Sequence, residues 1–188
     1  MNAENDMARV FVSAGSNIDP GENIKKALIE LARHVRILGI STVYLTEPEG
    51  RLEQPKFYNC VVEVDSQIPP EDLKYKVLRR IEDSLGRRRN DDKYAERTID
   101  LDLILYGDLV INTDAMRLPD PQILVRPFIA IPLQELSPGL VLPGLGVSID
   151  DVARRLGGSK MKPLVSYTAS LRREIHNEGE RREGRKPR

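Results

Sequence analysis

The stretch "ERTIDLDLILYGD", residues 96–108, alternates polar and apolar residues with the period of a β-strand. Because residues two apart in a strand share a face, Asp100 and Asp102 should project side by side. Their apolar neighbours should project from the opposite face: Ile99, Leu101, Leu103 and Leu105. On a helix the two aspartates would lie about 200° apart, and the alternation would have no use. The pattern therefore predicts a strand that carries two neighbouring carboxylates.

Two adjacent carboxylates repel each other unless a positive charge lies between them. A divalent cation meets this need, and Mg²⁺ prefers a couple of carboxylates together with waters and substrate phosphates. The alternative is a solvated strand face on which arginine side chains pair with the aspartates. The spacing of Asp100 and Asp102 is compatible with both interpretations.

Basic residues crowd the segment before this strand. Arg97 lies just before Asp100, and a polar loop lies further upstream. The loop holds four basic residues: Arg87, Arg88, Arg89 and Lys93. Guanidinium groups suit phosphate oxygens, and a cationic loop can close over them, although a solvated surface loop is the alternative. Together, the carboxylate pair and the arginine-rich loop favour transfer of a phosphorus group from a nucleotide.

The composition argues against several other classes of function. The chain has 188 residues with 29 Lys+Arg and 29 Asp+Glu, so there is no general attraction to nucleic acid or to a membrane surface. The two histidines, His34 and His176, lie in a helical pattern and in a charged tail, which gives little support to Ser–His or Cys–His catalysis. The single cysteine, Cys60, lies among strand-forming residues and is expected to be a core thiol.

The sequence also bears on location and partners. No apolar run approaches the ~20 residues of a spanning helix, and the N-terminus lacks the apolar core of a signal peptide. We therefore expect a cytoplasmic protein with small-molecule substrates and without nucleic-acid or membrane partners. The sequence does not fix the oligomeric state, for which a monomer is the default expectation.

Strands and helices alternate along the rest of the chain. Residues 8–17 predict a strand that ends in a turn at Gly15 to Asn17, and residues 57–65 predict another with Phe57 and Asn59 on one face. Helical patterns cover residues 19–35, 69–86, 126–136 and 147–158. Residues 107–108 could turn the strand at Asp100 into a hairpin with residues 109–112.

These elements predict one domain of the α+β class. The order of strands and helices favours a ferredoxin-like sandwich, a mainly antiparallel sheet packed by helices, over a doubly wound parallel sheet. We expect a disordered segment at residues 1–7, the domain at residues 8–157 and a charged C-terminal extension at residues 158–188. The extension is so polar that it predicts a mobile tail or a lone amphipathic helix without a core stripe.

"AERTIDLDLILYGDLVIN", residues 95–112, resembles the signature of the 6-hydroxymethyl-7,8-dihydropterin pyrophosphokinase family of folate biosynthesis, whose core is R-T-x-D-x-D followed by two aliphatic residues. Three more segments match the family in order: "VFVSAGSN", "TEPEGRLEQPKFYN" and "RPFIAIPLQEL". The similarity covers roughly residues 8 to 150. It implies an ATP-dependent diphosphotransferase.

The resemblance also implies residue roles. Asp100 and Asp102 would hold two Mg²⁺ ions that bridge the ATP phosphates, and Asp100 would also lie near the pterin hydroxymethyl group. The pterin site would comprise Thr46, Phe57, Asn59, Tyr94, Asp100 and Phe128, with the two phenylalanines on either side of the ring. The ATP site would comprise Glu82, Arg89, Arg97, Leu103, Asp120 and Arg126. The catalytic residues would be Arg87, Arg97, Asp100 and Asp102.

Some of these residues have an ordinary structural alternative, and one position departs from the family pattern. Phe57 and Phe128 could be core residues, and Glu82 could be a solvated helix residue. In "RLPDPQI" the family usually shows Pro-His-Pro, whereas this chain has Asp120 at the position of the histidine.

The implied reaction moves pyrophosphate from ATP to the hydroxymethyl group of the reduced pterin and releases AMP. Two rival functions stay open. One is another ATP- and Mg²⁺-dependent transferase on the same scaffold, and the other is a catalytically silent ferredoxin-like binding module.

Overall fold

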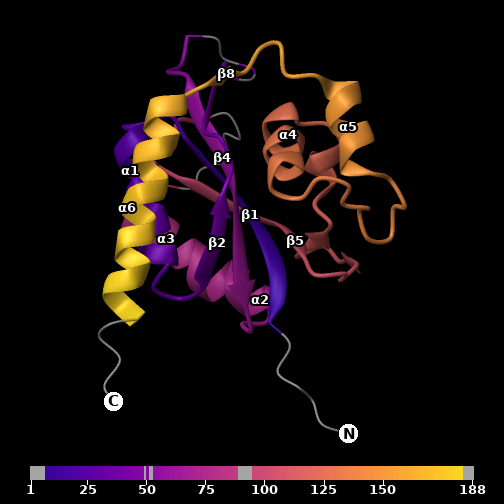
Figure 1. The fold of residues 1–188 in the computed structure, drawn as a ribbon, viewed down its shortest axis with the longest axis horizontal. Coiled ribbons are helices and arrows are strands. Elements are labelled where there is room, and N and C mark those ends of the chain that lie inside the picture. Colours follow the sequence, from indigo (N-terminus) through magenta and orange to yellow (C-terminus); the bar gives the residue numbers. More distant parts are fainter. Residues whose placement is uncertain (1–6, 49, 51–52, 89–94, 184–188) are drawn as a thin grey trace, which may run out of the picture.

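An antiparallel sheet forms the centre of the molecule (Figure 1). The computed structural model describes residues 7–48, 50, 53–88 and 95–183. The strand order is β5-β1-β4-β3-β8, and β2 also pairs with β4. The strands are β1 (Ala8–Ser16), β2 (Arg36–Ile40), β3 (Tyr44–Thr46), β4 (Phe57–Ser66), β5 (Asp100–Tyr106) and β8 (Lys162–Pro163). Every pairing among these strands is antiparallel, which agrees with the predicted ferredoxin-like α+β fold rather than a doubly wound parallel sheet.

Helices cover both faces of the sheet (Figure 1). One face packs against α1 (Pro20–Leu31), α6 (Val165–Glu183) and a helix that runs through α2 (Pro70–Asp72), η1 (Leu73–Leu78) and α3 (Arg79–Ser84). The other face packs against α4 (Pro127–Leu136) and α5 (Ile149–Leu156). Strand alternation sends Cys60, Val62 and Val64 of β4 to the first face and Val61 to the second. The second face holds the candidate site described below.

A β-bulge changes the alternation of β5. Val12 pairs with Leu103 and Phe11 pairs with Leu105, so Ile104 is the extra residue on β5. Leu101 and Leu103 pack in the α1 core as predicted, but Leu105 packs with Phe11 in the α4 core. The prediction that Leu105 shares a face with Leu103 was wrong, because one inserted residue reverses the faces beyond it.

The elements around this frame differ in detail from the predicted ones. β1 extends through Ser16, so the predicted turn at Gly15 begins later. The predicted helix at residues 69–86 forms, but its middle section, η1, is π-helical. Residues 111–112 form β6 (Ile111–Asn112), which pairs with β7 (Arg117–Leu118) and not with β5. A 3₁₀ turn, η2 (Pro121–Leu124), then leads to α4.

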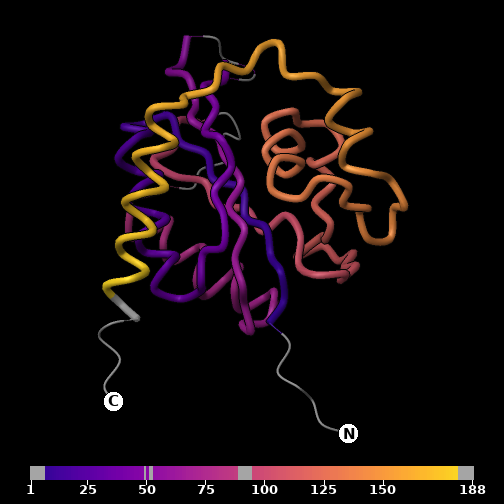
Figure 2. Tube along the Cα trace, in the orientation of Figure 1, coloured from indigo at the N-terminus to yellow at the C-terminus, as the bar shows by residue number. Residues whose placement is uncertain are grey.

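The C-terminal residues dock on the domain. Figure 2 shows the chain returning from α5 across the top of the molecule and running down beside α1. Leu171 and Ile175 of α6 are buried in the α1 core, and Arg172 Nε donates a hydrogen bond to the carbonyl oxygen of Ile40 at 2.9 Å. The prediction of a tail without a core stripe was therefore wrong. None of the helices in the described part of the chain is long and apolar enough to cross a membrane.

Candidate active site

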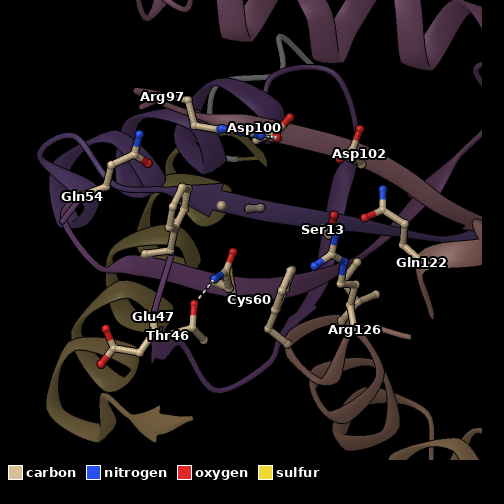
Figure 3. A pocket seen from close by; sticks show the side chains of 16 residues that line it. Ser13, Thr46, Glu47, Gln54, Cys60, Arg97, Asp100, Asp102, Gln122 and Arg126 are labelled. Carbon is tan, nitrogen blue, oxygen red and sulfur yellow. Dashed lines mark hydrogen bonds and ion pairs between the residues drawn. The ribbon is translucent and has the colours of Figure 1, made fainter. Parts of the chain in front are cut away.

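A cavity of about 360 Å³ lies on the α4 face of the sheet (Figure 3). Its size falls in the usual range of small-molecule pockets, ~300–1,000 Å³. Its walls come from β1, β3, β4, β5, the turn η2 and α4. The residues are Ser13, Ala14, Gly15, Thr46, Glu47, Gln54, Phe57, Asn59, Cys60, Arg97, Asp100, Asp102, Gln122, Arg126, Phe128 and Ile129. In Figure 3, Asp100 and Asp102 lie along one wall, and Thr46 and Glu47 lie on the opposite side.

Antiparallel pairing brings the two aspartates into line with small residues of β1. Asp102 lies opposite Ser13 and Asp100 lies opposite Gly15. The predicted strand and the predicted shared face of the two carboxylates are both present, since both side chains line the cavity while Leu101 is buried on the other side. The small residues leave the carboxylates open to the cavity.

Gly15 also makes room for an amide. Gly15 pairs with Asn59 of β4, and a Cβ atom on Gly15 would lie only 2.7 Å from Asn59 Oδ1. The other side of the amide is fixed because Asn59 Nδ2 donates to Thr46 Oγ1 at 2.7 Å (the dashed line in Figure 3). Asn59 is thus held in one orientation, with donor and acceptor groups available to a planar polar ligand.

Two aromatic rings line the cavity, and each has a guanidinium beside it. Arg97 Cζ lies 5.8 Å from the ring centroid of Phe57, and Arg126 Cζ lies 5.8 Å from that of Phe128. Both rings are partly buried and border the cavity, so neither is a fully enclosed core residue. Asn17 orients the first of these arginines, because the backbone N–H of Arg97 donates to Asn17 Oδ1 at 2.8 Å.

Asp100 is paired with two arginines. Arg97 Nη1 donates to Asp100 Oδ2 at 2.5 Å, and Arg87 Nη1 donates to Asp100 Oδ1. Arg87 Nη1 also pairs with Glu82 Oε1. Burial by itself lowers the pKa of Arg87, but the carboxylates of Asp100 and Glu82 outweigh burial and raise that pKa above its ordinary value. The arginine partners proposed as an alternative to a metal ion are therefore present at Asp100.

Asp102 lies in a different electrostatic environment. Burial, followed by the negative charges of Asp100, Asp120 and Glu82, raises the pKa of Asp102 to about 7. A carboxyl group in this state favours a proton or a cation in its neighbourhood. Within the described ranges, no cluster of three or more His, Cys, Asp and Glu side chains is placed to hold a metal ion. A cation at this pair would therefore need further ligands from water or phosphate, which is the usual arrangement for Mg²⁺.

Several predicted site residues lie away from the cavity wall. Glu82 is 2% exposed and accepts a hydrogen bond from the backbone N–H of Leu101 at 2.9 Å, so it is not the solvated helix residue that was the alternative. Leu103 is buried in the α1 core. Asp120 caps η2, because its Oδ1 accepts from the backbone N–H of Gln122 at 2.8 Å. Arg89 and Tyr94 lie outside the described residues.

Sequence reasoning missed other residues of the cavity. Ser13 and Gly15 alternate with buried Val12 and Ala14, so the pattern "VSAG" held a signal for a strand face open to a ligand. Gln122 carried no such signal, because it reaches the cavity only through the path of the η2 turn.

Comparisons with known proteins give consistent results. Residues 11–138 match the family described as 7,8-dihydro-6-hydroxymethylpterin-pyrophosphokinase (HPPK). A 2-amino-4-hydroxy-6-hydroxymethyldihydropteridine pyrophosphokinase from Pseudomonas aeruginosa is 36% identical over 72% of this chain and 84% of its own length. The enzyme of the same name from Haemophilus influenzae is 30% identical over 84% of this chain and 99% of its own length.

Longer proteins match as well. The folic acid synthesis protein fol1 of Pneumocystis carinii is 34% identical over 86% of this chain, which spans 22% of that protein. A crystal structure of Plasmodium falciparum HPPK-DHPS has a TM-score of 0.69 at 13% identity and covers 86% of this chain, which spans 50% of that chain. This structural likeness supports the fold.

Proposed function

The chain belongs to the 7,8-dihydro-6-hydroxymethylpterin-pyrophosphokinase family, and on this premise we propose that it transfers pyrophosphate from ATP to the hydroxymethyl group of a reduced pterin. The observation that carries the proposal is the carboxylate pair Asp100–Asp102 at the wall of a cavity that also holds two aromatic rings and two arginines. Such a cavity suits a planar heterocycle next to a polyphosphate.

The pterin half of the cavity would be formed by Phe57, Phe128 and Asn59. The two rings would stack on the faces of the pterin, and Asn59, held by Thr46, would bond to its polar edge. Tyr94 would be a further residue that contacts the pterin. Because the rings and the amide recognise a flat polar heterocycle, they favour a pterin over another small alcohol.

The nucleotide half would be formed by the arginines. Arg97 and Arg126 line the cavity and would bind phosphate oxygens, and we expect Arg89 to join them. Arg87 would leave Asp100 when the nucleotide arrives and turn to the phosphates. Three further residues would support this half from outside the cavity wall. Glu82 and Asp120 would act through their charges on Asp102, and Leu103 would act through the backbone of β5.

The carboxylate pair fits Mg²⁺ by its chemistry, since Asp102 is buried among other negative charges. Two Mg²⁺ ions held by Asp100 and Asp102 would neutralise charge that develops on the phosphates during transfer. Arg87 and Arg97 occupy the two carboxylate oxygens of Asp100, so these ion pairs would have to loosen for Asp100 to hold a cation. Through this exchange Asp100 would link nucleotide binding to the position of Arg87.

The reaction is a displacement at the β-phosphorus. The hydroxymethyl oxygen forms a bond to that phosphorus, the bond to the α–β bridging oxygen breaks, and AMP leaves with the bridging oxygen. The hydroxyl proton passes to a carboxylate of the site or to water. The chain itself contributes positioning and fixed positive charge, which together can supply most of the acceleration.

The test is to incubate the chain with ATP, Mg²⁺ and 6-hydroxymethyl-7,8-dihydropterin and to identify the nucleotide product. We expect AMP together with a pterin that carries two phosphates. ADP would indicate transfer of a single phosphoryl group and would contradict the proposal. Absence of turnover would favour the silent binding module, and a reaction with the pterin omitted serves as the control.

A further inference from the structure

The C-terminal segment, residues 162–183, lies beyond residues 11–138, which match the family model, and it contacts the frame of the cavity. It contains β8 and the helix α6. β8 pairs with β3, with Tyr44 opposite Pro163 and Leu45 opposite Lys162. This pairing adds a strand to the edge of β3, a strand of only three residues.

Two hydrogen bonds tie the residue before β3 to the start of α6. The backbone N–H of Leu164 donates to the carbonyl oxygen of Val43 at 2.8 Å. The backbone N–H of Val43 donates to Thr168 Oγ1 at 2.9 Å. Val43 is fully buried and Thr168 is 3% exposed, so water cannot easily replace these bonds. Both backbone groups of Val43 thus depend on the C-terminal segment.

The strand β3 connects Val43, which these two hydrogen bonds hold in place, to the cavity. Thr46, the last residue of β3, lines the cavity and holds the amide of Asn59 through its hydroxyl group. A second contact supports β4: the ring of Tyr167 packs edge-on against Tyr58 with centroids 5.4 Å apart, and its hydroxyl group donates to the carbonyl oxygen of Gly21 at 2.6 Å. Tyr58 lies between Phe57 and Asn59, the two β4 residues proposed to contact the pterin.

We propose that the C-terminal segment positions the pterin half of the cavity, with Thr168 as the positioning residue. The nucleotide half is separate from this restraint, because Asp100 and Asp102 lie on β5, at the opposite edge of the sheet from β8. Loss of the contacts made by this segment should therefore weaken pterin binding more than nucleotide binding. This inference rests on the proposed function.

The test compares two substitutions at Thr168 with a control on the same helix. Thr168→Val keeps the shape but removes the acceptor for Val43, Thr168→Ser keeps the hydroxyl group, and Ser166→Ala removes an exposed hydroxyl group nearby. Dissociation constants are measured for the reduced pterin, in the presence of Mg²⁺ and a non-hydrolysable ATP analogue, and for the analogue alone.

For Thr168→Val we expect the pterin Kd to rise about threefold to tenfold, because part of the free energy of one buried hydrogen bond is lost from pterin binding. The Kd of the analogue should stay within about twofold of the wild-type value. Thr168→Ser and Ser166→Ala should bind both ligands like the wild type. An unchanged pterin Kd in Thr168→Val would overturn the proposal even if its melting temperature fell. Equal loss of both ligands would overturn it too, because it would indicate general loosening.

A second measurement needs no variant. Because coupling between two sites is reciprocal, pterin binding should slow amide hydrogen exchange in residues 162–171 of the wild-type chain. The ATP analogue alone should have a smaller effect there. Exchange in this segment that does not respond to the pterin would refute the coupling. The AMP assay on the wild type tests the proposed function separately from both of these comparisons.

Discussion

Asp100 and Asp102 share a face of β5 but differ in what surrounds them. Arg87 and Arg97 neutralise Asp100, whereas burial and neighbouring carboxylates raise the pKa of Asp102 to about 7. Asp100 thus already has positively charged partners, whereas a nearby positive charge would favour the ionised form of Asp102. The difference lies in the neighbours, because the two residues are chemically identical.

Replacing Asp102 with asparagine should separate activity from stability. Asp102→Asn should lower turnover at least ~10²–10³-fold, the loss expected for one preorganised charge-stabilising group. Asp100→Asn should lower turnover to a similar extent. Steady-state assays of AMP release with ATP, Mg²⁺ and reduced pterin measure both. A variant that turns over at close to the wild-type rate would contradict the assignment of the metal site.

The stability of the same Asp102→Asn variant should depend on pH relative to the wild type. The folded-state pKa of Asp102 lies above its ordinary value of 3.8, so this group stabilises the metal-free protein least when it is ionised. Its contribution is present below about pH 4 and is lost as the pH rises through about 7. Melting temperatures in EDTA should therefore favour the variant at pH 8 and not at pH 4, by a few degrees, since about 1 kcal/mol corresponds to roughly 2–4 °C for a domain of this size.

Asp120 has two separable effects, a cap and a charge. Asp120→Asn keeps an acceptor for the backbone N–H of Gln122 but removes a negative charge that acts on Asp102. It should therefore bind a non-hydrolysable ATP analogue more tightly at fixed Mg²⁺. The expected gain is about 1 kcal/mol after screening. Asp120→His should bind the analogue more tightly as well, because a histidine can donate to a phosphate oxygen.

Asp120→Ala is the matched control, because it removes the charge and the cap together. Titrating the ATP analogue into all three variants at fixed Mg²⁺ measures how the charge of Asp120 affects nucleotide binding. Weaker binding by Asp120→Asn would mean that the carboxylate itself supports the nucleotide site.

At the scale of elements, Glu82 connects the helix α3 to the strand β5. This residue of α3 accepts from the backbone N–H of Leu101, between the two aspartates of β5, and pairs with Arg87, which begins the loop after α3. The helix, the strand and the start of the loop are therefore joined by one buried carboxylate. Arg87 and the strand that carries the aspartates thus share one buried carboxylate.

Removing the guanidinium of Arg87 should affect catalysis more than binding. Arg87→Ala should lower turnover much more than it weakens ground-state ATP binding, since Arg87 is expected to reach the phosphates only in the loaded complex. Arg88→Ala is the control, because Arg88 is exposed. Equal losses of nucleotide affinity and turnover in Arg87→Ala would make it a static binding residue. Turnover numbers and the Kd of an ATP analogue distinguish the two cases.

The helix α6 should contribute to global stability. Leu171 is 1% exposed in the α1 core, so Leu171→Ala should destabilise the fold by about 2–5 kcal/mol. Arg173→Ala, on an exposed position of the same helix, should have little effect. Chemical denaturation of both variants gives the comparison. A Leu171→Ala variant as stable as the wild type would show that α6 does not dock in solution.

At the scale of the whole molecule, the sheet separates two cores with different tasks. Toward α1 and α6, β4 presents Cys60, Val62 and Val64 to the core, whereas toward α4 it packs Val61 and opens into the cavity at Asn59 and Phe57. Both clusters bury apolar side chains, but only the α4 side of β4 also borders the cavity described here. Central β4 takes part in both.

Cys60 reports on the integrity of this arrangement. Its thiol is 1% exposed, and burial raises its pKa to about 12, so very little reactive thiolate exists in the native protein. At pH 8 we expect alkylation of native protein to be slower by orders of magnitude than alkylation in denaturant. Mass spectrometry at timed intervals follows the reaction. Rapid alkylation of native protein would mean that β4 opens locally without global unfolding.

The amino-acid sequence by itself determined what depends on short-range periodicity. The strand that carries Asp100 and Asp102, the faces of β4 with Phe57 and Asn59, and the helix at α4 all follow from alternation or helical spacing within a few residues. The ferredoxin-like order followed from the succession of these elements, and the ordered motifs indicated the family.

Only the tertiary structure decided what depends on contacts between distant segments. The bulge that turns Leu105 to the other core reflects pairing with Phe11, and the burial of Glu82 reflects its bonds to Leu101 and Arg87. The docking of α6 was missed because Leu171 and Ile175 form a narrow stripe among many charges, and this stripe is buried only because it packs with the apolar residues of α1. Local patterns indicate which way a side chain points only while the pairing register stays regular, whereas bulges and the partner that a side chain meets are set by the register and packing of the whole chain.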